Sequence, residues 1–182
     1  MKDKRKYVYI IHHLIDILSQ ARMLHQSFRR LSVQFSNMKA TDVIKRDHKA
    51  AEALFNKFKE ASPSEKEKME TRMFEALTTH ESMEDNYFYP ALKEKMEDDK
   101  ALAELEREQM GLEADVLVAR TIPGDRSARI EKIMEAVLAH AKKEETALFA
   151  KAEKLLGKEE LERLGEDMEP ESAVANDHEE KE

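Results

Sequence analysis

Two pairs of residues have the types and the spacing to bind a metal ion. His80 and Glu84 lie four positions apart, and His140 and Glu144 repeat that spacing sixty residues later. Residues four apart share one face of a helix, so each pair would present an imidazole beside a carboxylate. Burying an uncompensated carboxylate costs on the order of several kcal/mol. A metal ion shared by the two pairs would compensate both carboxylates.

Each pair lies within a stripe of apolar residues at helical spacing. The segment that precedes each pair also has an apolar stripe of helical spacing, and one polar residue lies within it. That residue is His48 in the first half and Gln109 in the second. The intervals agree, with 32 residues from His48 to His80 and 31 from Gln109 to His140. This regularity predicts a duplicated helical hairpin, in which four helices project ligands into one centre. Helical bundles build di-iron carboxylate sites in this way.

The composition favours helices almost throughout. The 182 residues include only four Gly, four Pro and no Trp, and 38% of them are charged. We therefore expect an all-α domain with extensions. The absence of Cys excludes disulfides, thiolate zinc sites and iron–sulfur clusters in this sequence, and fits a cytoplasmic protein. No run of eighteen apolar residues is present, so no transmembrane helix is predicted.

Local signals place the helices. Thr41 suits an N-cap, and Pro63 occupies the first helical position of the capping box at residues 62–65. Pro90 should kink or end the second helix after its ligands, and Asp125 should cap the fourth helix. Gly157 is a suitable end for that fourth helix. The expected helices span residues 41–59, 63–90, 101–121 and 126–157.

The two ends of the chain differ from the middle in charge. Residues 1–40 hold eight of the 31 Lys and Arg and two of the 39 Asp and Glu, so this segment is net +6 and the remainder net −14. The acidic body argues against nucleic-acid binding.

Within residues 1–40 we expect a basic amphipathic helix that packs on the bundle or docks to a partner or a membrane surface. Its histidines, His12, His13 and His25, are expected to be solvated or interfacial. Residues 157–182 should form a short helix at 159–165 and a disordered acidic tail from Glu166.

Three segments resemble the ordered motifs of the hemerythrin-like (HHE cation-binding) proteins. The first motif is similar to residues 41–48, Thr-Asp-Val-Ile-Lys-Arg-Asp-His. The second motif is similar to residues 77–92, which contain a Tyr-Pro pair near their end. Residues 140–149, with a Glu-Glu and a Leu-Phe pair, resemble the last motif. The resemblance covers residues 41–156 and implies an up-down-up-down four-helix bundle with a non-haem di-iron centre that can bind oxygen.

The resemblance also implies a ligand set. His48 and His80 would be terminal ligands of one iron, and His140 would serve the other. Glu84 and Glu144 would be the bridging carboxylates. Tyr87 and Tyr89 lie near these ligands in sequence and are expected to pack.

The third helix departs from the family pattern, which has a His followed four residues later by His or Glu. Here those positions are Gln109 and Glu113, and only Glu113 carries over directly as a ligand. An amide oxygen is a weaker ligand than imidazole, so the second metal position should be looser or richer in oxygen. Glu81 follows His80 and could compensate as an acidic ligand, although a solvated Glu beside the stripe is an equally good interpretation. Such a site favours ferric iron, so the centre should oxidise easily and carry oxygen reversibly only poorly.

Two classes of function follow. The first is a metal-binding protein that binds or senses oxygen, nitric oxide, peroxide or iron, with iron as the expected metal and zinc or manganese as alternatives. We find no general base independent of the metal, so an enzyme is not expected, although peroxidase-like or ferroxidase-like activity stays open. The second class is a helical interaction or structural module with a single-metal or empty site.

Overall fold

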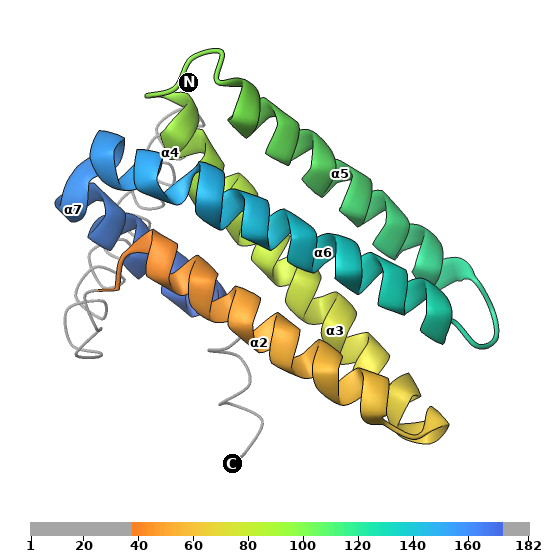
Figure 1. Ribbon diagram of the computed structural model, residues 1–182. Coiled ribbons are helices and arrows are strands. Elements are labelled where there is room, and N and C mark those ends of the chain that lie inside the picture. The colour runs from red at the N-terminus through yellow and green to blue at the C-terminus, as the bar shows by residue number, and fades with distance from the viewer. Residues whose placement is uncertain (1–37, 173–182) are drawn as a thin grey trace, which may run out of the picture. The chain divides into compact units, whose positions relative to one another are not determined.

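A computed structural model describes residues 38–172, and this part of the chain is helical, without strands (Figure 1). The predicted N-terminal helix and the end of the acidic tail lie outside the described residues. The elements are α2 (Ala40–Glu60), α3 (Pro63–Met83), the π-helix η1 (Glu84–Phe88), α4 (Tyr89–Lys93), α5 (Lys100–Thr121), α6 (Ser127–Ala147), α7 (Phe149–Met168) and the 3₁₀-helix η2 (Glu169–Glu171).

The four long helices α2, α3, α5 and α6 form an antiparallel bundle. Successive helices run in opposite directions, and α2 packs on α3 and α6 while α5 packs on α6 and α3 (Figure 1). The up-down-up-down arrangement is therefore confirmed. None of the described helices combines the length and the apolar character needed to cross a membrane.

The helices begin at the expected signals with one exception. At the start of α3, Ser62 and Glu65 complete the capping box, and at the start of α6 an oxygen of Asp125 accepts a hydrogen bond from the Ser127 N–H at 2.9 Å. The predicted cap at Thr41 is wrong, because α2 already begins at Ala40 and Thr41 lies buried within its first turn.

The second bundle helix passes through a wide π turn before Pro90. The Tyr89 N–H donates to the Glu84 carbonyl five residues earlier, in place of the usual spacing of four. Proline lacks an N–H, and its ring clashes with the carbonyl four residues before it in a regular α-helix. The wider turn relieves that clash, and the helix continues as α4. Pro90 thus changes the local winding without ending the helix.

The bundle interior contains two hydrophobic clusters. One gathers residues such as Ile44, Phe88 and Leu105, and the other gathers Phe58, Leu112 and Val137. The helices α2, α3 and α5 contribute to both clusters, while α6 contributes to the second and is followed by Leu148 of the first. The predicted polar residues of each helix lie between these contributions. The helices consequently place a polar layer between two apolar cores.

The fourth helix ends earlier than predicted, and the C-terminal helix extends further. The chain turns at Leu148, between α6 and α7, and α7 is broken at Gly157, whose φ of 75° is accessible to glycine at little cost. The last turns then pack against the start of α2. Gly165 approaches the backbone of Met38 so closely that an added Cβ would lie 2.0 Å from its carbonyl oxygen.

Side chains fasten the C-terminal segment to α2. Arg46 donates to Glu169 at 2.7 Å and to Ser172 at 2.6 Å. The Ser172 hydroxyl in turn donates to Asp47 at 2.6 Å. The prediction of disorder from Glu166 onward is therefore wrong for residues 166–172, because this segment has specific partners on α2.

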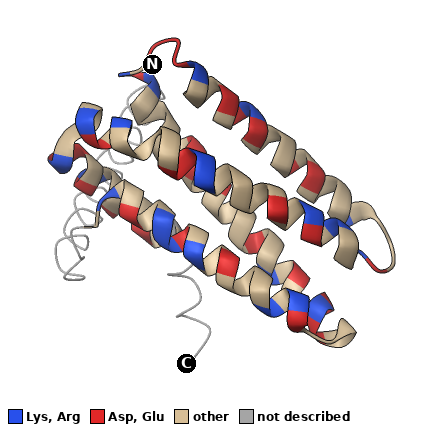
Figure 2. Cartoon of the chain, in the orientation of Figure 1, with Lys and Arg blue, Asp and Glu red and all other residues tan. Residues whose placement is uncertain are grey.

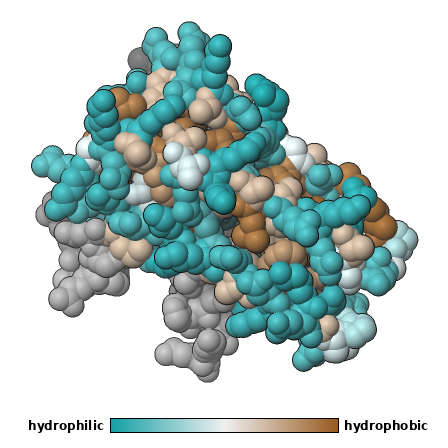
Figure 3. Space-filling view, viewed as in Figure 1, coloured by the Kyte–Doolittle hydropathy of each residue, from teal (hydrophilic) through white to brown (hydrophobic). Residues whose placement is uncertain are grey.

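The outer surface of the described part is mixed in charge. Basic and acidic residues are interspersed along the helices (Figure 2), and the face in Figure 3 is mainly hydrophilic with hydrophobic patches between helices. The large hydrophobic side chains that are exposed in the described part are Met110, Leu117, Val118 and Leu155.

Candidate metal centre

The polar layer between the two hydrophobic clusters contains the predicted metal ligands except Glu113. His48 comes from α2, Gln109 from α5 and His140 from α6, and each is at most 7% exposed. Glu84 and Glu144 are 1% and 0% exposed. Carboxylates are almost never buried this deeply without a partner. The layer therefore needs a compensating group.

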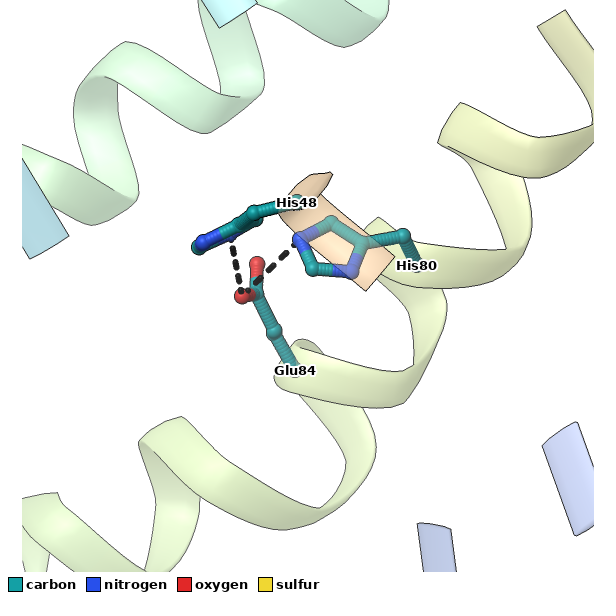
Figure 4. Close-up of side chains that lie close together, drawn as sticks. All are labelled: His48, His80 and Glu84. Carbon is teal, nitrogen blue, oxygen red and sulfur yellow. Dashed lines mark ion pairs between the residues drawn. The ribbon is translucent and has the colours of Figure 1, made fainter. Parts of the chain in front are cut away.

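Three side chains converge on one point in this layer. The Nε2 atom of His80 lies 3.1 Å from Oε1 of Glu84, and Nε2 of His48 lies 4.0 Å from the same oxygen (Figure 4). One ligand atom from each residue lies within 4.8 Å of the other two. Nitrogen and oxygen ligands bind transition metals at about 2.0–2.2 Å. A modest contraction would let these three donors share one ion.

Glu144 joins the same cluster from α6. Its Oε2 atom lies 3.4 Å from Nε2 of His48, and both of its carboxylate oxygens are buried without a hydrogen bond in the described part of the chain. The negative charge of Glu84 also acts on Glu144. Two neighbouring carboxylates with free oxygens can bridge a pair of cations.

His140 lies among a second set of groups. Its Nε2 atom is 3.4 Å from the Tyr89 hydroxyl, and its Nδ1 atom is 3.6 Å from Oε2 of Glu108. Tyr89 enters the layer because the π turn stacks residues five apart, which aligns it with Glu84. The burial of Tyr89 and the nearby charges of Glu84 and Glu144 raise the pKa of its hydroxyl, which stays protonated.

Gln109 faces the start of the π turn. Its amide nitrogen donates to the Glu81 carbonyl at 3.2 Å and to Oδ1 of Asp85 at 3.1 Å. Its amide oxygen is buried and has no hydrogen-bond partner among the described residues. The nitrogen thus has a structural role, while the oxygen is a free donor atom for a cation.

Glu81 is buried and Glu113 is exposed. Glu81 is only 5% exposed and its Oε1 atom has no hydrogen bond in the described structure, so the interpretation as a solvated residue does not hold. Glu113 lies one turn beyond Gln109, outside the buried cluster, although its charge acts on Glu81. Its role as a ligand stays a prediction.

Two further carboxylates contact the outer nitrogens of the histidines. Oε1 of Glu145 lies 3.0 Å from Nδ1 of His48, and Glu108 faces Nδ1 of His140 while pairing with Lys143. A carboxylate at Nδ1 fixes the proton on that nitrogen, so Nε2 is free to bind a metal. The 3.0 Å contact with Glu145 thus favours for His48 the tautomer that a metal site needs, whereas Glu108, at 3.6 Å from Nδ1 of His140, is near that ring without a hydrogen bond to it.

Without a cation, burial makes the charged forms of the layer unfavourable. Burial and the neighbouring His80 lower the pKa of His48 to about 2, and burial lowers the pKa of His140 as well. Burial raises the pKa of Glu84 to about 8, and burial together with the charge of Glu84 raises that of Glu144 well above its usual value. A cation would reverse these preferences by stabilising the carboxylate anions.

The donor set fits a metal ion. Buried atoms without a hydrogen bond in the described residues include Nε2 of His48 and oxygens of Glu84, Glu144, Glu81 and Gln109. Buried polar atoms are normally paired, and such a concentration of unpaired ones is what a cation would satisfy. Mixed imidazole and carboxylate donors suit iron, zinc or manganese.

Sequence reasoning missed four residues of this layer. Glu145 and Glu108 do not belong to the apolar stripes, and only the structure shows that they reach histidines on neighbouring helices. Asp85 meets Gln109 in the same way. Tyr89 was expected only to pack, and the signal that could have placed it is Pro90, which requires an altered turn immediately before it.

Comparison with known proteins agrees with this geometry. The family profile of the hemerythrin HHE cation binding domain matches residues 39–152, which is more than half of the chain. Comparison with curated proteins and with solved structures gives no match. The matched range spans all four bundle helices and the whole polar layer. The chain is a metal-binding helical bundle that belongs to the hemerythrin HHE cation-binding family.

Proposed function

We propose that the protein holds non-haem iron, as a di-iron or mixed-occupancy centre, and that it binds or senses a small ligand such as oxygen, nitric oxide or peroxide. The observation that carries this proposal is the convergence of His48, His80 and Glu84 in a buried layer. Family membership supports a cation there, and the histidine–carboxylate set supports iron.

The two metal positions differ in their donors. His48, His80 and Glu84 would hold the first ion, with Glu144 as a second carboxylate between the two positions. His140 would serve the second ion, together with oxygen donors from Glu81, Gln109 and Glu113. This second position is poorer in imidazole, so it should bind its ion less tightly and favour the ferric state.

Iron would supply redox chemistry and a coordination position for the small ligand. The protein supplies orientation and exclusion of water. Glu145 would hold the proton of His48 on Nδ1, and the two hydrophobic clusters flank the layer at both ends of the bundle. The protonated Tyr89 hydroxyl offers a hydrogen bond inside the layer, beside His140.

The test is the metal content of anaerobically purified protein, followed by its visible spectrum when air is admitted. Two irons per chain, with near-ultraviolet bands of an oxo-bridged ferric pair, are expected. One ion of another metal, or none, with no spectral change, would contradict the proposal.

A single-metal or structural bundle is the second candidate. It is favoured by one observation, the use of the Gln109 amide nitrogen as a structural donor to Glu81 and Asp85. Replacing both His80 and His140 with Leu separates the two functions. A structural bundle should tolerate or gain from the change, because apolar residues would replace buried polar ones, whereas a metal protein should lose metal and stability.

A further inference from the structure

A large groove reaches the metal layer from outside the bundle. It has a volume of about 780 Å³ and lies between α2 and α3, which are joined at one end of the bundle (Figure 1). Residues Met134, Val137 and Leu138 of α6 line it as well. His48 and His80 are among its lining residues, so the groove leads to two of the proposed ligands.

Small side chains on both walls make this space. On α2 the groove is lined by Ala50, Ala51 and Ala53, with Ala61 directly after the helix, and on α3 by Ala76. Larger residues at these positions would close the seam between the two helices. Leu54 and Met73 keep the remaining wall apolar.

The groove is far larger than a diatomic ligand requires. One water molecule takes up about 30 Å³ of liquid, whereas pockets of roughly 300–1,000 Å³ hold organic ligands of tens of atoms. Along α2 the lining runs from Asp47 to Glu60, which at 1.5 Å per residue is about 20 Å. An elongated apolar molecule fits this shape.

Most of the charged lining residues lie toward the connection between α2 and α3, which is here called the mouth of the groove. They are Lys57, Lys68 and Arg72 with Glu60 and Glu65, whereas Asp47 lines the other end beside His48. Glu65 is already engaged, because it accepts hydrogen bonds from the N–H and the hydroxyl of Ser62. The lysines can therefore bind an anionic group at the mouth, while the inner part accepts hydrocarbon.

We propose that this groove binds a free long-chain monocarboxylate, with its acyl chain along the α2–α3 seam toward His48 and its carboxylate between Lys57 and Lys68. The ligand would cover the approach to the two histidines from this side. The site does not depend on the proposed metal function, because His48 and His80 at its inner end are the only proposed metal ligands among its lining residues, and the lysines that would bind the carboxylate lie elsewhere.

The test uses the full chain and palmitate, measured by displacement of a fluorescent fatty acid below the micelle concentration. Saturable binding of one palmitate per chain is expected. The variant Ala76→Phe should fill the groove and weaken binding at least about tenfold, equal to about 1.4 kcal/mol. The matched control Ala114→Phe places the same side chain on an exposed position of α5 and should bind normally.

A second test asks whether the lysines at the mouth of the groove bind the carboxylate of the ligand. The double variant Lys57→Glu/Lys68→Glu should weaken palmitate binding but leave binding of the uncharged alcohol of equal chain length unchanged. The control Lys132→Glu/Lys142→Glu alters two exposed lysines of α6 and should bind both ligands normally. Circular dichroism of each variant verifies folding.

Several outcomes would overturn the proposal. They are the absence of palmitate binding by the full chain, equal binding by Ala76→Phe and its control, and binding to phospholipid vesicles without binding of free palmitate. The variant His140→Leu separates this site from the metal centre. It should lose metal and keep palmitate binding, because His140 does not line the groove.

Discussion

At the scale of single residues, the metal layer depends on side chains beyond the predicted ligands. His48 has a carboxylate on each side of its ring, with Glu145 at Nδ1 and Glu144 at Nε2. The two have different tasks, because Glu144 is fully buried and free to bind a cation, whereas Glu145 is partly exposed and orients the ring. Two adjacent residues of α6 thus contact the two ring nitrogens of His48, Glu144 on the buried side and Glu145 on the outer side.

Removing the orienting carboxylate should weaken metal binding without unfolding the protein. We expect Glu145→Ala to lower iron affinity by roughly 10–100-fold, the usual effect of losing an outer partner of a ligating histidine. Glu145→Gln should lose less, because its amide oxygen can still accept from Nδ1–H. Chelator competition measures the affinity, with Glu135→Ala on the exposed face of α6 as the control. Equal affinity in the Ala variant and the control would contradict this role.

Gln109 stands where the resemblance to the family implies a His ligand, and a substitution can restore that imidazole. Gln109→His should strengthen binding of the second ion by roughly tenfold, about 1.4 kcal/mol, because imidazole is a stronger ligand than an amide oxygen. The control Gln109→Leu should lose both the donor to Asp85 and the free oxygen. Titration with ferrous iron, followed by metal counting after desalting, measures the change. An unaltered second affinity in Gln109→His would show that this position is no ligand.

At the scale of elements, the periodic spacing of apolar residues predicted most of the bundle. The features that were not predicted depend on changes in helical winding and on distant contacts. His48, His80, Glu84, His140 and Glu144 interrupt regular stripes, and the structure buries all of them except His80, which is partly exposed. The direction of Tyr89 could not be predicted from 3.6 residues per helical turn, because the π turn changes which helix face the following residues occupy. The extension of α7 beyond Gly165 was also missed, since its support comes from Arg46 and Asp47, more than a hundred residues earlier.

Two glycines in helices should respond in opposite ways to substitution. Gly165→Ala should destabilise the protein by about 1–3 kcal/mol, because the added Cβ would overlap the Met38 carbonyl and push α7 from α2. Gly111→Ala should stabilise it by about 1 kcal/mol, because nothing lies near the added Cβ and alanine favours the helix. Urea unfolding of both variants measures the difference. A neutral Gly165→Ala would mean that the α7–α2 contact contributes little to stability.

At the scale of the whole molecule, the buried layer links folding to pH and to metal. In the metal-free protein, Glu81 and Glu84 have pKa values of about 8 against 4.5 in an ordinary environment, because burial disfavours their anions. The folded state therefore binds more protons than the unfolded state between these values, and stability falls as pH rises. His48 acts in the opposite sense only below pH 6.5, since its pKa is lowered to about 2.

Between pH 6.5 and 8 only the carboxylate effect remains, so metal-free protein should lose stability over this interval. Each such group contributes up to about 1.4 kcal/mol per pH unit. Iron-loaded protein should instead hold or gain stability, because a cation binds the deprotonated carboxylates and releases their protons. Urea unfolding at pH 6.5 and 8, with and without chelator, measures how the free energy of unfolding changes with pH in the metal-free and the iron-loaded protein. A flat curve for the metal-free protein would mean that water enters the layer and hydrates the carboxylates, and the cation would then not be needed to keep the two hydrophobic clusters together.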